Sequence, residues 1–279
     1  MIMALFNYTF MQNALIAAIL ASIVTGIIGT IAIEKKLISM SGGIAHASFG
    51  GIGLGYLLGF EPIWGGLAFA IGSSAVISKS SNNKKISADT LIGILWSFGM
   101  ALGIFFISLK PGYMPDMTSY LFGDILSISN SAIILMSIFT LIILFVFIIM
   151  YNYWIIYLLD EEFAKAKKIN IRLIKFIVYL LLPIGIIVLT RVVGIILTIA
   201  LMTIPTSMAK LFFNSFSKVV ISSIFISMFF CVSGLIISYY INIPSGVCII
   251  IIMTIVYLTV FFLKKTVQYR LHEKKVHGN

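Results

Sequence analysis

The sequence predicts an all-α, polytopic transmembrane helical bundle of about nine spans, which two observations support. Of its 279 residues, 61% are hydrophobic and only 10% are charged, and the mean hydropathy is +1.14. A soluble domain carries about 25% charged residues. The apolar residues also come in many runs near the roughly 20 residues that cross a hydrocarbon core as a helix. We therefore expect one transmembrane domain over 1–279, with almost no chain outside the membrane.

The apolar runs are expected to be helices because lipid requires each span to satisfy its own backbone hydrogen bonds. They lack the short alternating pattern of a membrane barrel. The first run starts close to Met1 and leads into further spans, so we expect a retained helix and no cleaved signal peptide. Only Thr190 and Arg191 interrupt the apolar sequence between the sixth and seventh runs, so a merged or re-entrant segment would leave eight spans. The predicted spans are 9–33, 41–60, 62–78, 89–109, 131–158, 173–190, 192–212, 219–240 and 246–263.

The basic residues alternate between loops in a way that predicts orientation. Of the 19 lysines and arginines, Lys110 and Arg191 fall in one set of loops and the other 17 in the opposite set or the tail. The positive-inside rule places the larger set in the cytoplasm. With nine spans, the N-terminus is then outside and the basic tail, 264–279, inside. This distribution explains the net charge of +10 without nucleic acid.

Two loops are longer than a connection needs. The outer loop, 110–130, contains Asp116 and Asp124. The inner segment, 160–169, has acids first and bases last, an order that suits the dipole of a short helix. This pattern fits a cytoplasmic helix that docks on a partner, and equally a solvated linker. Cys231 and Cys248 lie in apolar runs without ligand-like spacing and are expected to be structural.

The segment 40–60 places His46, the only histidine outside the tail, in an apolar helix among seven glycines. An ionisable group at a helix centre costs about 2.5–3.5 kcal/mol of insertion energy, so it usually lines a polar path or binds a ligand. Gly51, Gly55 and Gly59 recur every four residues and predict one face for close helix packing. Neutral imidazole ligates Zn²⁺, Mn²⁺ or Fe²⁺. The alternative is a histidine that bonds a neighbouring carbonyl and holds two helices together.

Several segments together carry a family resemblance over nearly the whole chain. Segment 40–48 reads Met-Ser-Gly-Gly-Ile-Ala-His-Ala-Ser, and 119–126 reads Ser-Tyr-Leu-Phe-Gly-Asp-Ile-Leu. Similar segments lie at 89–95, 160–164, 192–197 through Pro205 and Ala209, 234–240 and 244–246. In this order and spacing the chain resembles the membrane permeases of ATP-binding-cassette importers for zinc, manganese and iron.

The resemblance implies a pore that is homodimeric, formed with a second copy of the chain, or pseudo-dimeric, together with a separate cytoplasmic ATPase pair and an extracytoplasmic metal-binding protein. It also implies a multi-pass protein of the cell membrane whose segment 160–169 is a coupling helix seated on the ATPase. The sequence agrees, because it has no Gly-x-x-x-x-Gly-Lys-Ser/Thr loop for nucleotide phosphates. The residues expected to contact the ATPase are Asp160, Glu161, Glu162, Phe163 and Ala164.

One position departs from the family pattern. Members usually carry an acidic residue four positions before the histidine, where the two side chains share one helix face. This chain has Gly42 there. In a dimer, the His46 side chains of both copies could meet near the two-fold axis. Asp89, which opens the fourth span, is a candidate for the metal path or for a helix N-cap, and Asp124 is a candidate at the outer mouth.

These observations predict the pore subunit of an ATP-driven importer of a divalent transition metal, which is cargo and not a bound cofactor. Zinc is placed first, manganese second and iron third, because segment 119–126 resembles zinc-type members more closely. An ion-coupled secondary metal transporter is the alternative, but it would be expected to bury several carboxylates in its spans. An intramembrane enzyme would need paired catalytic groups that the spans lack, so no catalytic residue is expected.

Overall fold

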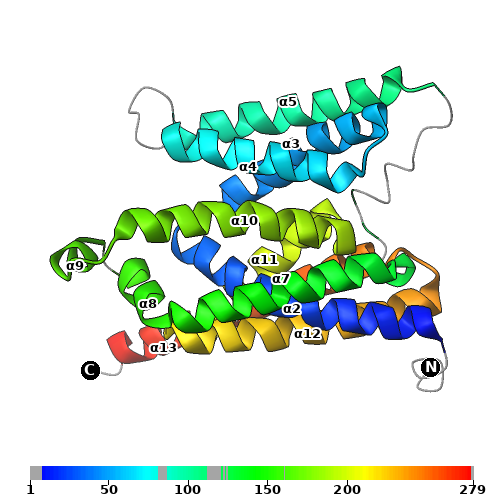
Figure 1. Ribbon diagram of the computed structural model, residues 1–279. Coiled ribbons are helices and arrows are strands. Elements are labelled where there is room, and N and C mark those ends of the chain that lie inside the picture. Colours follow the sequence, from blue (N-terminus) through cyan, green and yellow to red (C-terminus); the bar gives the residue numbers. More distant parts are fainter. Residues whose placement is uncertain are drawn as a thin grey trace.

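The computed structural model describes residues 8–80, 87–111, 121, 123, 125–159 and 161–277. Over these residues the regular structure is helical, as predicted (Figure 1). The helices are α2 (Thr9–Glu34), α3 (Ile38–Leu58), α4 (Pro62–Ser80), α5 (Ala88–Leu109), the short 3₁₀ helix η1 (Ile125–Ser127), α7 (Asn130–Ile149), α8 (Tyr151–Leu159), α9 (Glu161–Ala166), α10 (Ile171–Val193), α11 (Ile195–Phe212), α12 (Phe216–Ile241) and α13 (Ser245–His277).

Each of the nine predicted spans corresponds to a long helix in the described part of the chain. Seven of these helices are long and apolar enough to cross a membrane by themselves: α2, α5, α7, α10, α11, α12 and α13. The other two, α3 and α4, contain more glycine and serine, and α3 also carries His46. They have the length of a span, but their side chains are less apolar and favour transfer into lipid less strongly than those of the other seven helices.

Helices α3, α4 and α5 form one tightly packed unit (Figure 1). A Cβ atom at Gly51 would overlap the Gly65 carbonyl, so α3 and α4 touch through their backbones. A Cβ atom at Gly53 would likewise overlap Gly103 of α5. Small residues permit this approach and maximise van der Waals contact in lipid. The predicted packing role is thus confirmed for Gly51, but Gly59 ends α3 in the left-handed conformation, with open space where its Cβ would be.

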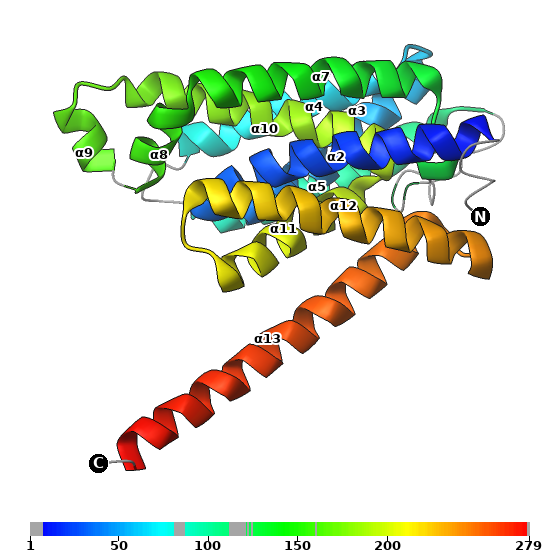
Figure 2. The ribbon, with the colours of Figure 1, turned by 90° about the horizontal axis from the view of Figure 1, so that it is seen from below.

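In the rest of the bundle, α2 packs against α12, α11, α7 and α10 (Figure 2). The three-helix unit joins this bundle mainly through the contact of α4 with α10. Helix α13 begins beside α12 and then projects away from the bundle (Figure 2). It is continuous to His277, so the predicted basic tail prolongs the last helix.

Two boundaries differ in detail from the expected ones. The sixth and seventh predicted spans are separate helices, as expected, but the break is at Gly194 and not at Thr190–Arg191. Gly194 has φ 82° and ψ 166°, a backbone conformation that is essentially restricted to glycine. The fifth predicted span, 131–158, is interrupted at Met150, where α7 ends and α8 begins.

Candidate metal pathway

His46 lies in the middle of α3, where it stacks on Trp96 of α5. The two ring centroids are 4.2 Å apart and the ring planes differ by 8°. The Nδ1 atom of His46 is buried and has no hydrogen-bond partner among the described residues. An unpaired buried polar atom is rare in proteins and calls for an explanation such as a ligand or an ion. His46 therefore does not hydrogen-bond a neighbouring carbonyl of the described residues through Nδ1.

Gly42, one helical turn before His46, faces an open position between two other helices. A Cβ atom there would lie 3.8 Å from Trp96 of α5 and 3.9 Å from Ile199 of α11, which are ordinary van der Waals distances. A Cβ atom is therefore accommodated at this position, although the sequence supplies none. Within the described residues, no group of three or more His, Cys, Asp or Glu side chains is close enough to hold a metal ion. One copy of the chain brings a single imidazole to this place.

Asp89 lies in the exposed first turn of α5, and the N-cap of this helix is a different residue. The Ser87 hydroxyl accepts a hydrogen bond from the Thr90 amide at 3.1 Å. Asp89 precedes Trp96 by two turns on the same helix face, which separates them by about 10 Å along the axis. Asp89 is thus not a ligand beside His46. It lies on the same face of α5 as Trp96, nearer the start of that helix. The other predicted acid, Asp124, lies outside the described residues.

The predicted coupling segment contains the short helix α9, Glu161–Ala166, at the far end of the bundle (Figure 1). Phe163 is 50% exposed and Glu162 is exposed, whereas Ala164 is fully buried. A turn at Lys168, which has φ 56°, ends the segment before α10. The helix is shorter than the predicted 160–169, and Asp160 and the side chain of Glu161 lie outside the described part. An exposed aromatic ring on a short helix that packs against α8 and α10 is suited to contact another protein.

A lysine connects this end of the bundle to the start of α3. Lys35, in the turn between α2 and α3, donates a hydrogen bond to the Tyr157 carbonyl of α8 at 2.6 Å. Its ammonium group also lies 3.7 Å from the centre of the Tyr157 ring, a cation–π distance. Lys35 thus places α8, the helix that precedes α9 in the chain, in direct contact with the turn that leads into the helix of His46.

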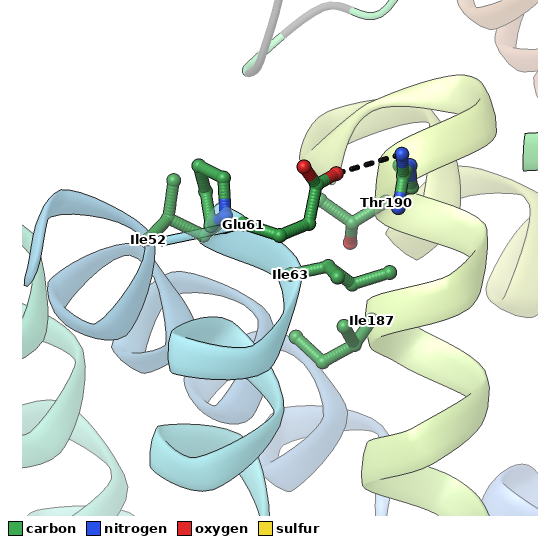
Figure 3. A pocket seen from close by; sticks show the side chains of 7 residues that line it. Ile52, Glu61, Ile63, Ile187 and Thr190 are labelled. Carbon is green, nitrogen blue, oxygen red and sulfur yellow. Dashed lines mark ion pairs between the residues drawn. The ribbon is translucent and has the colours of Figure 1, made fainter. Parts of the chain in front are cut away.

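An ion pair joins the three-helix unit to α10 at the opposite end of the bundle. Glu61, between α3 and α4, accepts from Arg191 at 2.8 Å beside a cavity of about 40 Å³ (Figure 3). Thr190 lines the cavity, and its buried hydroxyl has no hydrogen-bond partner in the described part of the chain. The cavity is large enough for water. Sequence reasoning placed Arg191 in the outer loops but gave no signal of this partner, or of the stack between Trp96 and His46.

The fold and these features define the class of the protein. A bundle of helices long and apolar enough to span a membrane, with one histidine inside a glycine-packed unit and a short exposed helix at one end, fits a multi-pass membrane permease. Residues 7–264 match the ABC 3 transport family, and the chain belongs to this family. The resemblance to permease subunits of metal-ion ABC importers is thereby confirmed. Such a subunit transports and is not itself an enzyme.

Curated relatives and a solved structure agree with this assignment. The chain is 33% identical to the uncharacterized membrane protein slr2045 of Synechocystis, over 90% of both chains. It is 29% identical to the manganese transport system membrane protein MntC of Listeria monocytogenes, over 92% of this chain and 91% of that one. Its structure is similar to PsaBC from Streptococcus pneumoniae in complex with Fab, with a TM-score of 0.84, 30% identity and coverage of 93% and 94%.

Proposed function

We propose that this chain is the pore-forming permease of an ATP-driven importer for a divalent transition metal. The observation that carries the proposal is the buried, unpaired nitrogen of His46 inside the three-helix unit. Two listeria relatives are named as manganese transport proteins and chlamydial ones as probable metal transport proteins, which supports metal as the cargo. The chain lies in the cell membrane, with the α9 end in the cytoplasm because the basic residues gather there.

The metal site is completed by a second copy of the chain. A single imidazole is a poor site for Zn²⁺, which takes three or four protein ligands. The structure offers one histidine per copy at this place, and the position beside it is occupied by a glycine. A homodimer in which two such faces meet supplies two imidazoles, and solvent supplies oxygen ligands, while Asp89 lies farther along the path. Alternating access then moves the metal from one side of this constriction to the other.

We place zinc before manganese and iron on ligand chemistry. Imidazole suits zinc, whereas carboxylate and carbonyl oxygens suit manganese. The missing acid at Gly42 removes the oxygen ligand that would favour manganese. The manganese-transport names belong to relatives at 27–30% identity. A different ligand at a single position is enough to change the preferred metal between proteins that share only 27–30% of their residues.

Energy enters through a cytoplasmic ATPase pair, since this chain has no nucleotide-binding loop. The exposed Glu162 and Phe163 of α9 form the docking contact, together with Asp160 and Glu161, while the buried Ala164 packs α9 against the bundle. Movement of α9 passes through α8 and Lys35 to α3. An extracytoplasmic metal-binding protein delivers the ion at the opposite end, where Asp124 belongs to the outer loop.

The test is radiometal uptake in cells that express the chain with its ATPase and metal-binding protein. Wild type, His46→Ala and the tail variant His272→Ala are compared for zinc, manganese and iron, with membrane levels of the chain measured in parallel. We expect zinc uptake to be lost in His46→Ala and retained in His272→Ala. Full uptake in His46→Ala would reduce this histidine to a packing residue. Uptake that persists without the ATPase but stops when the proton gradient is dissipated would identify an ion-coupled transporter instead.

A further inference from the structure

A basic groove lies between α4 and α10. It is at the end of the bundle that carries α9, and Figure 1 shows where these three helices lie. Its volume is about 630 Å³. Four cationic side chains line it and all four are exposed: Lys79, Lys165, Arg172 and Lys175. They come from the end of α4, from α9 and from the first turns of α10. Segments far apart in the sequence thus place their positive charges around one opening.

Both helical walls of the groove change from basic to apolar along the helix axis. On α4, Lys79 is followed at four-residue steps toward the bundle centre by Ala75 and Ile71. On α10, Arg172 is followed in the same way by Phe176 and Leu180. Residues four apart share a helix face, so each wall carries a cation at its rim and below it an apolar strip, whose residues extend to about 12 Å from the cation along the helix axis. Phe176 is 63% exposed, so this strip is open to a molecule from outside.

A hydrogen bond fixes the position of the two walls. The Ser74 hydroxyl of α4 donates to the Tyr179 carbonyl of α10 at 2.6 Å. Ser74 is 1% exposed, so this contact lies behind the groove and holds the helices at a set distance. The groove is therefore a formed feature of the seam between the three-helix unit and the rest of the bundle.

A second groove on the same seam provides an internal comparison. It has a volume of about 550 Å³ and lies at the opposite end, between α4, α7 and α10. Its walls are also apolar, with Trp64 and Ile138 among them. The charges at its rim are Arg191 and Glu61, which neutralise each other in the 2.8 Å ion pair. Two grooves of similar size and apolar lining thus differ in net charge.

We infer that the basic groove binds a phospholipid with an anionic headgroup, such as phosphatidylglycerol. Charge complementarity identifies this occupant: the phosphate and headgroup meet the cations at the rim, and an acyl chain lies along the apolar strips. Basic pockets between transmembrane helices on the cytoplasmic side are suited to anionic headgroups. A soluble anion would use the rim but leave the apolar strips uncovered. The second groove, whose rim is neutral, has no such preference.

The test uses the purified full-length chain in phosphatidylcholine nanodiscs that contain a photoactivatable phosphatidylglycerol. Crosslinked peptides are mapped by mass spectrometry, and parallel discs contain photoactivatable phosphatidylcholine. We expect phosphatidylglycerol to label the 71–79 and 172–180 segments preferentially. Each near-surface cation contributes about fivefold to binding of anionic lipid. Lys79→Gln, Lys165→Gln and Arg172→Gln combined should thus reduce the preference roughly a hundredfold.

The matched control replaces Lys218, Lys264 and Lys265 by glutamine, which removes three charges at the same end of the bundle but outside the groove. Its labelling should equal that of wild type. If the triple groove variant does not fold, Arg172→Gln alone should still show about a fivefold loss. Equal loss in both triple variants would mean general attraction to the surface and would overturn the site. Displacement of the lipid by inorganic phosphate, or loss of ATPase binding with unchanged lipid labelling, would overturn it as well.

Discussion

The substitution Gly42→Asp tests most directly how this chain handles metal. A Cβ atom at Gly42 would lie 3.8 Å from Trp96 and 3.9 Å from Ile199, which are ordinary contact distances, so a side chain can begin at this position without overlap of its Cβ. His46 follows four residues later, and Cβ atoms at this spacing are about 5–6 Å apart on one helix face. The carboxylate and the imidazole can therefore reach the same cation. The change restores a ligand pair where the chain now has one ligand.

The magnitude follows from charge and burial. A carboxylate at the centre of a membrane helix costs about 2.5–3.5 kcal/mol of insertion energy, which we expect to appear as a lower melting temperature of the metal-free protein. A divalent cation about 4 Å from the carboxylate gains roughly 8 kcal/mol at an effective dielectric constant of 20. Dehydration of the ion consumes much of this energy. If a fifth remains, the affinity rises at least tenfold.

The assay is competitive uptake of radioactive manganese and zinc by cells that carry the importer. Because an oxygen ligand favours manganese, the ratio of manganese to zinc uptake should rise at least tenfold in Gly42→Asp. Gly72→Asp on α4 is the control, since it introduces the same charge at a position with open space around its Cβ. An unchanged ratio in Gly42→Asp, or an equal rise in Gly72→Asp, would refute the assignment of the ligand face.

Three further predictions concern packing, the aromatic stack and docking. Gly51→Ala should lower stability by about 1–3 kcal/mol, because its Cβ overlaps a neighbouring backbone, whereas Gly93→Ala, with open space, should leave the melting temperature unchanged. Trp96→Ala should reduce metal uptake because the site histidine loses its stacking partner, and Trp96→Phe should retain most of it; equal loss in both would show that stacking is not the reason. Phe163→Ala should abolish co-purification of the ATPase, while Phe212→Ala, which removes a similarly exposed ring, should not. Normal ATPase binding by the first variant would exclude α9 as the docking helix.

Most of the fold could be predicted because lipid simplifies the problem. Each apolar run has to be a helix, so the long helices lie where the hydropathy places them. Two boundaries were shifted for local reasons. Gly194, with a conformation restricted to glycine, ends α10 later than the polar pair Thr190–Arg191 suggested. The chain also breaks at Met150, which nothing in the uniformly apolar sequence indicated.

The site was predicted only in part. His46 was identifiable because a histidine in an apolar helix is conspicuous. Its environment was not, because Trp96 resembles any other aromatic residue of a membrane span, and only the packing of α3 on α5 brings the rings together. Asp89 was recognised as a helix-start residue, but the cap is Ser87.

The sequence by itself determined the class of the protein, the places and order of its long helices and the histidine in α3. Composition, hydropathy and the order of short motifs are properties of the linear sequence. The tertiary structure alone decided which helices meet: the opening beside Gly42 between Trp96 and Ile199, and the basic groove between α4 and α10. These features combine residues far apart in the sequence. Lipid is as apolar as the side chains that face it, so which helices pack together depends on the fit of small residues between helices and not on the hydropathy of either one.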